Sequence, residues 1–210
     1  MVKVAIIDYG VGNVKSLKHS LEKVGAEVSI TSDKEILKNA DGMILPGVGA
    51  FEPAIQNLTP MIEFIMDQTD KGKPMMGICL GLQLLFTESL EGVEEDQEPF
   101  KGLDIVPGTV RHFPKDMDLT IPHMGWNSLI INDKEHPLFL DIDEGSYVYF
   151  VHSYYGDAKN QENIVTTTKY GIEFPSTVGS DNVFATQFHP EKSGKVGLSI
   201  LTNFLNYLKQ

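Results

Sequence analysis

The first half of the chain alternates short apolar runs with segments whose apolar residues recur every three to four positions. Apolar runs predict buried strands at residues 3–7, 26–30, 43–45 and 74–78. Periodic segments predict helices at 14–24, 54–66 and after residue 79, and a short helix after the capping candidates Thr31, Ser32 and Asp33. This alternation is typical of βαβ units, so we expect a largely parallel sheet covered by helices.

The second half changes to strands separated by turns, followed by one more helix. Strands are predicted at 103–113, 126–131, 146–152, 164–169 and 182–189, and the helix at 196–208. We expect these strands to be antiparallel additions to the parallel sheet. No linker, repeat or low-complexity segment divides the chain. Residues 1–210 are therefore predicted to form one α/β domain of the flavodoxin-like, three-layer type with a mixed, mostly parallel sheet.

Composition and charge narrow the function classes. With 41% apolar residues the chain can build a core, and its net charge of −12 offers no basic field for nucleic acid. Its single cysteine excludes an internal disulfide and a multi-cysteine zinc site, which indicates a reducing compartment. No targeting segment or apolar run of about 20 residues occurs, so we expect a cytoplasmic protein without membrane contact. Acidic residues gather at 88–98, which we interpret as a solvated loop in preference to a functional acidic tract.

Cys79 lies between Gly77 and Gly81 where a predicted strand meets a predicted helix. Small residues two positions away on each side permit the sharp turn of a nucleophile elbow. We expect the following helix to direct its N-terminus at the sulfur and to favour the thiolate. The alternative is that Cys79 is a small buried core residue, but the flanking glycines favour a reactive thiol.

A nucleophilic cysteine needs a base, and His189 is the best of six candidates. It ends an apolar strand and precedes Pro190 and Glu191, so the carboxylate can turn back to orient the imidazole. The other five are His19, His112 and His136, which we expect to be solvated, and His123 and His152, which have no acid shortly after them. The predicted triad is Cys79 as nucleophile, His189 as base and Glu191 as orienting group.

Acyl transfer also needs donors for the oxyanion. The N–H of Leu80, directly after the nucleophile, is one candidate. The other is the peptide of Val48, which lies between Gly47 and Gly49 at the end of a predicted strand. An ordinary turn would explain the second segment equally well.

Three segments together resemble the triad-type glutamine amidotransferases over nearly the whole chain. They are Pro46-Gly47-Val48-Gly49, Gly77-Ile78-Cys79-Leu80-Gly81-Leu82-Gln83 and Gln187-Phe188-His189-Pro190-Glu191. More narrowly, five segments resemble the glutaminase subunits of imidazole glycerol phosphate synthases. They are Asp8-Tyr9-Gly10-Val11-Gly12-Asn13, Pro46-Gly47-Val48-Gly49-Ala50-Phe51, His123-Met124-Gly125-Trp126-Asn127, Phe150-Val151-His152-Ser153-Tyr154-Tyr155 and His189-Pro190-Glu191-Lys192-Ser193. At residues 87–91, Thr87-Glu88-Ser89-Leu90-Glu91, the chain differs from the sequence that is more common in the family.

The resemblance implies that the thiolate attacks the side-chain amide of glutamine, that ammonia leaves, and that water hydrolyses the thioester. It implies no cofactor and no metal. Carried over by position, the glutamine pocket contains Gly49, Gln83, Ser153 and Tyr154, with Leu80 beside them. Gln83 also follows Cys79 by four positions, which places both on one helix face.

The resemblance further implies a heterodimer in the histidine pathway. The partner is a (βα)8-barrel cyclase that receives ammonia through a channel and forms imidazole glycerol phosphate and aminoimidazole carboxamide ribonucleotide. Interface candidates are Asn13, Trp126 and Lys192. A lone tryptophan is more typical of a core, but its motif favours a docking anchor. We expect the acidic residues at 88–98 to lie away from the partner.

Three other interpretations stay open on the sequence. The chain could be the glutaminase of a different biosynthetic synthase, or a cysteine peptidase with the same triad chemistry. It could also be a non-enzymatic flavodoxin-like regulatory module in which Cys79 is structural.

Overall fold

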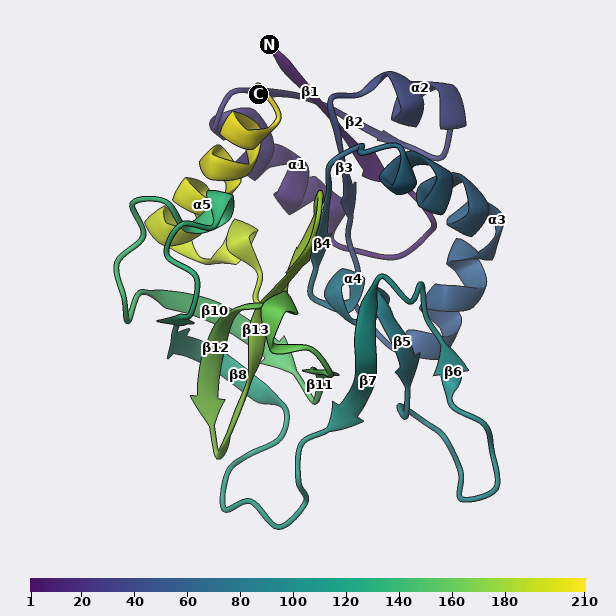
Figure 1. Ribbon diagram of the computed structural model, residues 1–210, viewed down its shortest axis with the longest axis vertical. Helices are drawn as coiled ribbons and strands as arrows, with labels where there is room; N and C mark the ends of the chain where they lie inside the picture. Colours follow the sequence, from purple (N-terminus) through teal and green to yellow (C-terminus); the bar gives the residue numbers. More distant parts are fainter.

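An eight-stranded sheet forms the centre of the computed structural model, which describes residues 1–210 (Figure 1). Its strands, in spatial order, are β2 (Ala26–Thr31), β1 (Val2–Ile7), β3 (Gly42–Leu45), β4 (Met75–Ile78), β14 (Val183–Thr186), β13 (Ile172–Ser180), β12 (Ile164–Tyr170) and β9 (Ile130–Ile131). The run from β2 to β14 is parallel, and β13, β12 and β9 add to it in antiparallel fashion. The predicted class, a mixed and mostly parallel sheet, is confirmed.

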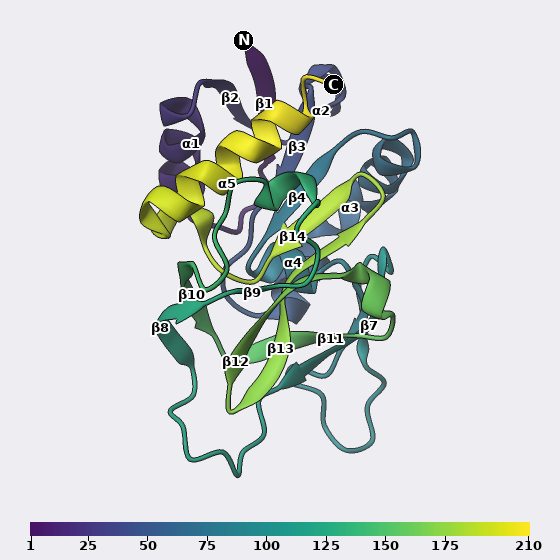
Figure 2. The same cartoon turned by 60° about the vertical axis from the view of Figure 1, so that its left-hand side comes forward.

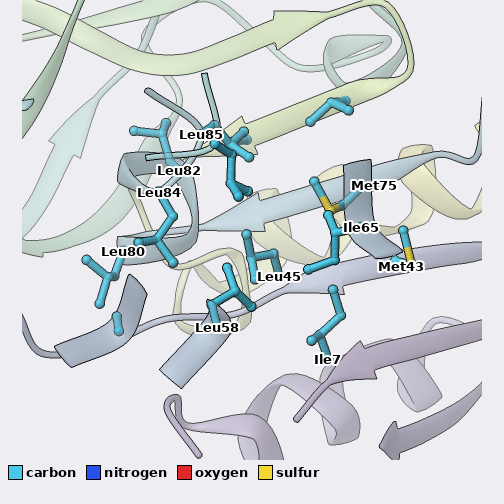
Figure 3. Packing of buried hydrophobic residues seen from close by; sticks show 14 of the residues in the cluster. Ile7, Met43, Leu45, Leu58, Ile65, Met75, Leu80, Leu82, Leu84 and Leu85 are labelled. Carbon is cyan, nitrogen blue, oxygen red and sulfur yellow. The ribbon is translucent and has the colours of Figure 1, made fainter. Parts of the chain in front are cut away.

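Helices cover both faces of the parallel part of this sheet (Figures 1 and 2). On one face lie α1 (Val14–Lys23) and α5 (Gly194–Tyr207), and on the other α2 (Lys34–Asn39) and α3 (Phe51–Asp70). Alternation along the strands supplies both cores, because Ile44 packs with α1 and α5 whereas Leu45 packs with α3. Figure 3 shows Leu45 and Leu58 within the α3-side core.

Half of the strands from β7 to β14 lie in separate small sheets, which the sequence did not predict. One has the order β11 (Tyr154–Ala158), β7 (Val106–His112), β5 (Phe86–Ser89) and β6 (Phe100–Lys101), and the other pairs β10 (Tyr147–His152) with β8 (His123–Ser128). Of the expected antiparallel additions only β9 and β12 join the large sheet, and β14 joins it in parallel to β4. The expectation is therefore confirmed for β9 and β12 and wrong for β7, β8 and β10, because strand patterns report burial on a face but not the pairing partner.

The helix after Cys79 is much shorter than predicted. It comprises only α4 (Leu80–Gln83), and Phe86 already begins β5. Leu82, Leu84, Leu85 and Phe86 are all fully buried, so the run has no polar face whose period could separate helix from strand. A helix of four residues also carries a small dipole, which weakens the expected support for a thiolate from this source.

No helix in the structure combines the length and apolar character needed to cross a membrane.

Candidate active site

Two adjacent parallel strands bring the predicted nucleophile and base to one edge of the sheet. Ile78, the last residue of β4, lies opposite Thr186, the last residue of β14, and the N–H of Cys79 donates to the Thr186 carbonyl at 2.7 Å. Cys79 and His189 therefore leave the sheet side by side. In open α/β sheets this carboxyl edge is where ligand sites form.

The backbone at Cys79 has the strained geometry of a nucleophile elbow. Its φ of 55° and ψ of −108° are unusual for a residue with a side chain. A Cβ at Gly81 would come within 2.0 Å of the Leu45 carbonyl oxygen, so only glycine fits there. Strain of this kind is typical of functional sites, where the surrounding packing maintains it.

His189 and Glu191 form a buried pair beside the cysteine. Their Nδ1 and Oε1 atoms are 2.8 Å apart, with side chains only 2% and 4% exposed. Burial disfavours the imidazolium, but the nearby Cys79 sulfur in its anionic form and the hydrogen bond and charge of Glu191 outweigh it and raise the pKa of His189 to about 9. The Nε2 atom of His189 is buried and has no partner in this geometry, so it is free to exchange a proton.

Ser193 holds the backbone of His189 in place. Its hydroxyl donates to the His189 carbonyl at 2.6 Å and accepts from the Tyr149 N–H at 2.9 Å. The N–H of His189 donates to the Tyr149 carbonyl at 2.9 Å. The base is thereby fixed to β10, the strand that carries Tyr149.

Gln187 contacts the cysteine sulfur, a role the sequence did not reveal. Its Nε2 lies 3.8 Å from Sγ of Cys79, and its Oε1 accepts from Gln83 at 3.1 Å. The carbonyl of Val151 lies 3.9 Å from the same sulfur. Gln187 precedes His189 by two positions, so both side chains of this extended segment point the same way, which was the available signal.

The segment predicted to supply the second oxyanion donor lies against the elbow. A Cβ at Gly47 would come within 2.7 Å of the Leu80 side chain, and the N–H groups of Val48 and Gly49 donate no hydrogen bond within the chain. The hydroxyl of Tyr9 donates to the Pro46 carbonyl at 2.6 Å. Val48 and Gly49, with unbonded N–H groups, thus belong to a segment that Tyr9 anchors beside the cysteine, and both residues line the cavity there.

A cavity of about 290 Å³ joins these groups. It is lined by Val48, Gly49, Cys79, Leu80, Gln83, Glu91, Pro122, Val151, His152, Ser153, Tyr154 and His189. All the predicted pocket residues are present, including Gly49, Gln83, Ser153 and Tyr154. Glu191 lies behind His189 and does not line the cavity.

Glu91 lines the cavity although the sequence placed it in a solvated acidic loop. Its Oε2 accepts from the Phe51 N–H at 2.8 Å, at the start of α3. Burial raises the pKa of this carboxyl, while the Phe51 N–H and His112 act in the opposite direction. The loop interpretation holds for the exposed Glu94, Glu95, Asp96 and Glu98. It is wrong for Glu88, which lies half-buried in β5 and pairs with Lys101, and for Glu91, because composition could not distinguish these acids from their neighbours.

The three predicted interface residues are all exposed. Trp126 is 55% exposed on β8 and packs edge-on against Tyr149. The Nζ atom of Lys192 lies over the ring of the same tyrosine, 5.8 Å from the ring centre. Asn13 is exposed at the start of α1, a helix that contacts the 3-10 turn Pro190–Lys192. Trp126 is therefore not a core residue.

His136 is buried, which contradicts the predicted solvation. It packs against Phe139 and Phe184, and burial lowers its pKa to about 4. The turn-rich sequence around it is polar, but the following 3-10 turn, Pro137–Phe139, buries Leu138 and Phe139 and packs against α5. His123 and His152 are buried as well.

The glutamine amidotransferase class-I family model matches residues 5–207, and the chain belongs to that family. At the finer level, it is 49% identical to the imidazole glycerol phosphate synthase subunit HisH of Archaeoglobus fulgidus, covering 99% of this chain and 100% of the relative. The subunit of the same name from Halobacterium salinarum is 46% identical over 97% of this chain and 93% of its own length. A solved structure of PurLQS from Thermotoga maritima superimposes with a TM-score of 0.75 at 21% identity, over 99% of both chains, which shows the shared fold.

Proposed function

We propose that residues 1–210 form the glutaminase subunit of an imidazole glycerol phosphate synthase in histidine biosynthesis. The membership in the glutamine amidotransferase family and the relatives named HisH support this assignment. One observation supports the chemistry most directly. Cys79, at a strained elbow, and His189, which is buried and bonded to Glu191, line the same cavity.

The mechanism follows from the chemistry of each group. Because the pKa of His189 is about 9, the imidazole ring holds the proton when Cys79 is the thiolate. The sulfur attacks the side-chain amide carbon of glutamine, and the oxyanion receives hydrogen bonds from the N–H of Leu80 and from the peptide of Val48 or Gly49. As the intermediate collapses, the C–N bond breaks and His189 Nε2 gives its proton to the departing ammonia.

Water then completes the cycle. His189 takes a proton from water as the oxygen attacks the thioester carbon, and the C–S bond breaks to release glutamate and regenerate the thiolate. Glu191 keeps the imidazole in the tautomer with hydrogen on Nδ1 and stabilises the imidazolium. No cofactor enters either half-reaction.

Glutamine is expected to lie between Cys79 and Glu91, which line the same cavity. A carboxylate there is suited to the α-ammonium group of an amino acid, because charge-assisted hydrogen bonds are the strong ones. Gln83, Ser153 and Tyr154 form the wall between the two ends. This arrangement supports glutamine over a peptide, whose α-amine is acylated.

The ammonia acceptor is proposed to be a separate (βα)8-barrel cyclase that docks on the face bearing Trp126, Lys192 and Asn13. Trp126 is a large exposed aromatic residue, the type that anchors interfaces. The subunit name of the relatives supports a heteromeric enzyme.

The decisive experiment is a glutaminase assay of the chain alone and with the cyclase, using wild type and Cys79→Ala. We expect ammonia release that the cyclase increases, and none from Cys79→Ala although it still binds the cyclase. Ammonia release by Cys79→Ala would overturn the assignment of the nucleophile. Absence of Cys79 labelling by 6-diazo-5-oxo-norleucine in the wild type would instead favour a non-enzymatic module.

A further inference from the structure

The carbonyl oxygen of Tyr154 accepts two hydrogen bonds from buried side chains. One comes from Nε2 of Gln83 at 3.0 Å and the other from Nδ1 of His152 at 2.8 Å. A carbonyl oxygen can only accept, so Nδ1 of His152 carries a hydrogen. In a neutral imidazole, Nε2 of His152 is then an acceptor.

A second histidine continues the same chain of hydrogen bonds. Nδ1 of His123 lies 3.0 Å from Nε2 of His152, and Nε2 of His123 lies 3.2 Å from Nδ2 of Asn127. The amide of Asn127 is oriented independently, because its Oδ1 accepts from the Ser128 N–H at 2.8 Å. Both ends of the chain therefore impose one direction, in which each histidine donates through Nδ1 and accepts through Nε2.

The two rings are enclosed by aromatic side chains. His123 is 3% exposed and His152 is 6% exposed, and their ring neighbours are Phe113, Phe150, Tyr170 and Phe174. Burial lowers the pKa of His123 to about 4 and that of His152 to about 3. Neutral imidazoles at pH 7 agree with the direction of the hydrogen bonds.

At its inner end the chain reaches the nucleophile. Gln83 uses its second N–H to donate to Oε1 of Gln187 at 3.1 Å, and Nε2 of Gln187 lies 3.8 Å from the Cys79 sulfur. At its outer end Asn127 neighbours the exposed Trp126 on β8. An unbroken series of polar contacts thus connects a surface strand with the reactive sulfur.

We propose that His123 and His152 are positioning residues for glutamine hydrolysis. As neutral imidazoles that each donate through Nδ1, they fix the Tyr154 carbonyl, and through Gln83 and Gln187 they hold the N–H that faces Cys79. The proposal rests on the proposed function, because glutamine hydrolysis is one of its readouts.

Paired substitutions test the direction of the chain. In His152→Asn the side-chain nitrogen takes the place of Nδ1 and still donates to Tyr154, whereas His152→Phe keeps a ring and loses the donor. We expect His152→Phe to lower kcat for glutamine in the complex with the cyclase by about 10- to 100-fold, with a smaller change in KM. His152→Asn should keep most of the wild-type kcat. At position 123 likewise, kcat should be higher in His123→Asn than in His123→Phe.

His136 provides the matched control, because it is a buried histidine among aromatic rings without a contact to this chain. His136→Asn and His136→Phe should leave kcat unchanged once corrected for the folded fraction. Equal kcat values for the Asn and Phe variants at His152, or values that follow stability alone, would overturn the proposal.

A spectroscopic readout is independent of glutamine and of variant folding. In wild-type chain labelled with ¹⁵N-histidine, two-bond ¹H–¹⁵N spectra at pH 7 should show His123 and His152 as neutral imidazoles protonated at Nδ1. Protonation of either at Nε2, or an imidazolium, would overturn the proposal. Alkylation of Cys79 by iodoacetamide should be slower in His152→Phe than in His152→Asn, so a failure of the glutaminase assignment stays distinguishable from a failure of this network.

Discussion

The hydroxyl of Tyr9 donates a hydrogen bond of 2.6 Å to the carbonyl oxygen of Pro46. Tyr9 follows β1 and Pro46 follows β3, so the bond joins the ends of two neighbouring strands. The next residues after Pro46 carry the N–H groups proposed for the oxyanion. A single buried hydroxyl therefore restrains the peptide on which stabilisation of the intermediate depends.

Tyr9→Phe tests this restraint. Removing the hydroxyl leaves the Pro46 carbonyl without this donor, which should cost about 1–3 kcal/mol of folding stability. Because the oxyanion segment gains freedom, kcat for glutamine should fall by about tenfold while KM changes little. Steady-state kinetics with the cyclase present measure both constants. Tyr207→Phe on α5, whose hydroxyl makes no hydrogen bond within the chain, is the control, and equal kinetics in the two variants would contradict the prediction.

Glu191→Gln should remove the charge that supports the imidazolium. Because the Glu191 carboxylate is one of the groups that raise the pKa of His189, the neutral amide should lower that pKa and reduce kcat by roughly 100-fold or more. Titration of the His189 ring by NMR reports the pKa, and single-turnover thioester formation reports the rate. An unchanged pKa would show that Glu191 does not act through its charge.

Glu91→Gln should mainly raise KM for glutamine. The amide oxygen can still accept from the Phe51 N–H, so the α3 terminus stays capped, but the charge opposite the substrate ammonium is lost. A charge-assisted hydrogen bond contributes about 1.5–3 kcal/mol, which corresponds to a KM increase of about 10- to 100-fold. Glu95→Gln, an exposed site on the same loop, should leave KM unaltered. A fall in kcat alone would argue against a substrate contact.

Folding stability should decrease on mild acidification. Burial lowers the pKa of His123 and His136 to about 4 and that of His152 to about 3, so below pH 6.5 the unfolded chain binds protons that the folded chain does not. The stability that these three neutral histidines contribute is therefore full above pH 6.5 and declines as the pH falls toward 4, by up to about 1.4 kcal/mol per unit for each histidine. His189, whose pKa is raised, adds no slope in this range because it is protonated in both states below pH 6.5. Urea unfolding between pH 5 and 6.5 measures the slope, which should be shallower in His136→Asn. A flat profile would contradict buried neutral histidines.

Trp126→Ala should weaken cyclase binding without unfolding the chain. A large aromatic anchor typically contributes 2 kcal/mol or more, so Kd should rise by about 30-fold or more. Ile36→Ala removes another exposed apolar side chain, on α2, at the opposite end of the molecule from β8 in Figure 1. Calorimetric titration should separate the two variants, and equal affinities would place the interface elsewhere.

The sequence by itself determined the parallel first half of the sheet and the residues of the triad. The strands follow from local signals, because apolar runs and helical periods define βαβ units. Cys79 and His189 follow from the glycines around the cysteine and from the Pro190 and Glu191 that follow the histidine, whereas the parallel pairing of β14 with β4 that places them side by side was decided by the tertiary structure. The spacing of His189 and Glu191 is likewise local, since two residues in an extended turn suffice to bring a carboxylate to the ring.

Only the tertiary structure decided how the second half is arranged and which polar residues enter the site. Strand pairing depends on contacts between residues far apart in the sequence. No local sequence pattern therefore indicated that β7, β8 and β10 form small separate sheets. In the sequence, Glu91 could not be distinguished from the acidic residues around it, although it lines the cavity. Gln187 was recognised only as part of a motif, and its contact with the Cys79 sulfur was not predicted. His123 and His152 became a pair because β8 and β10 place them directly opposite each other. Side-chain contacts between distant strands arise from that register, which periodicity along one strand cannot report.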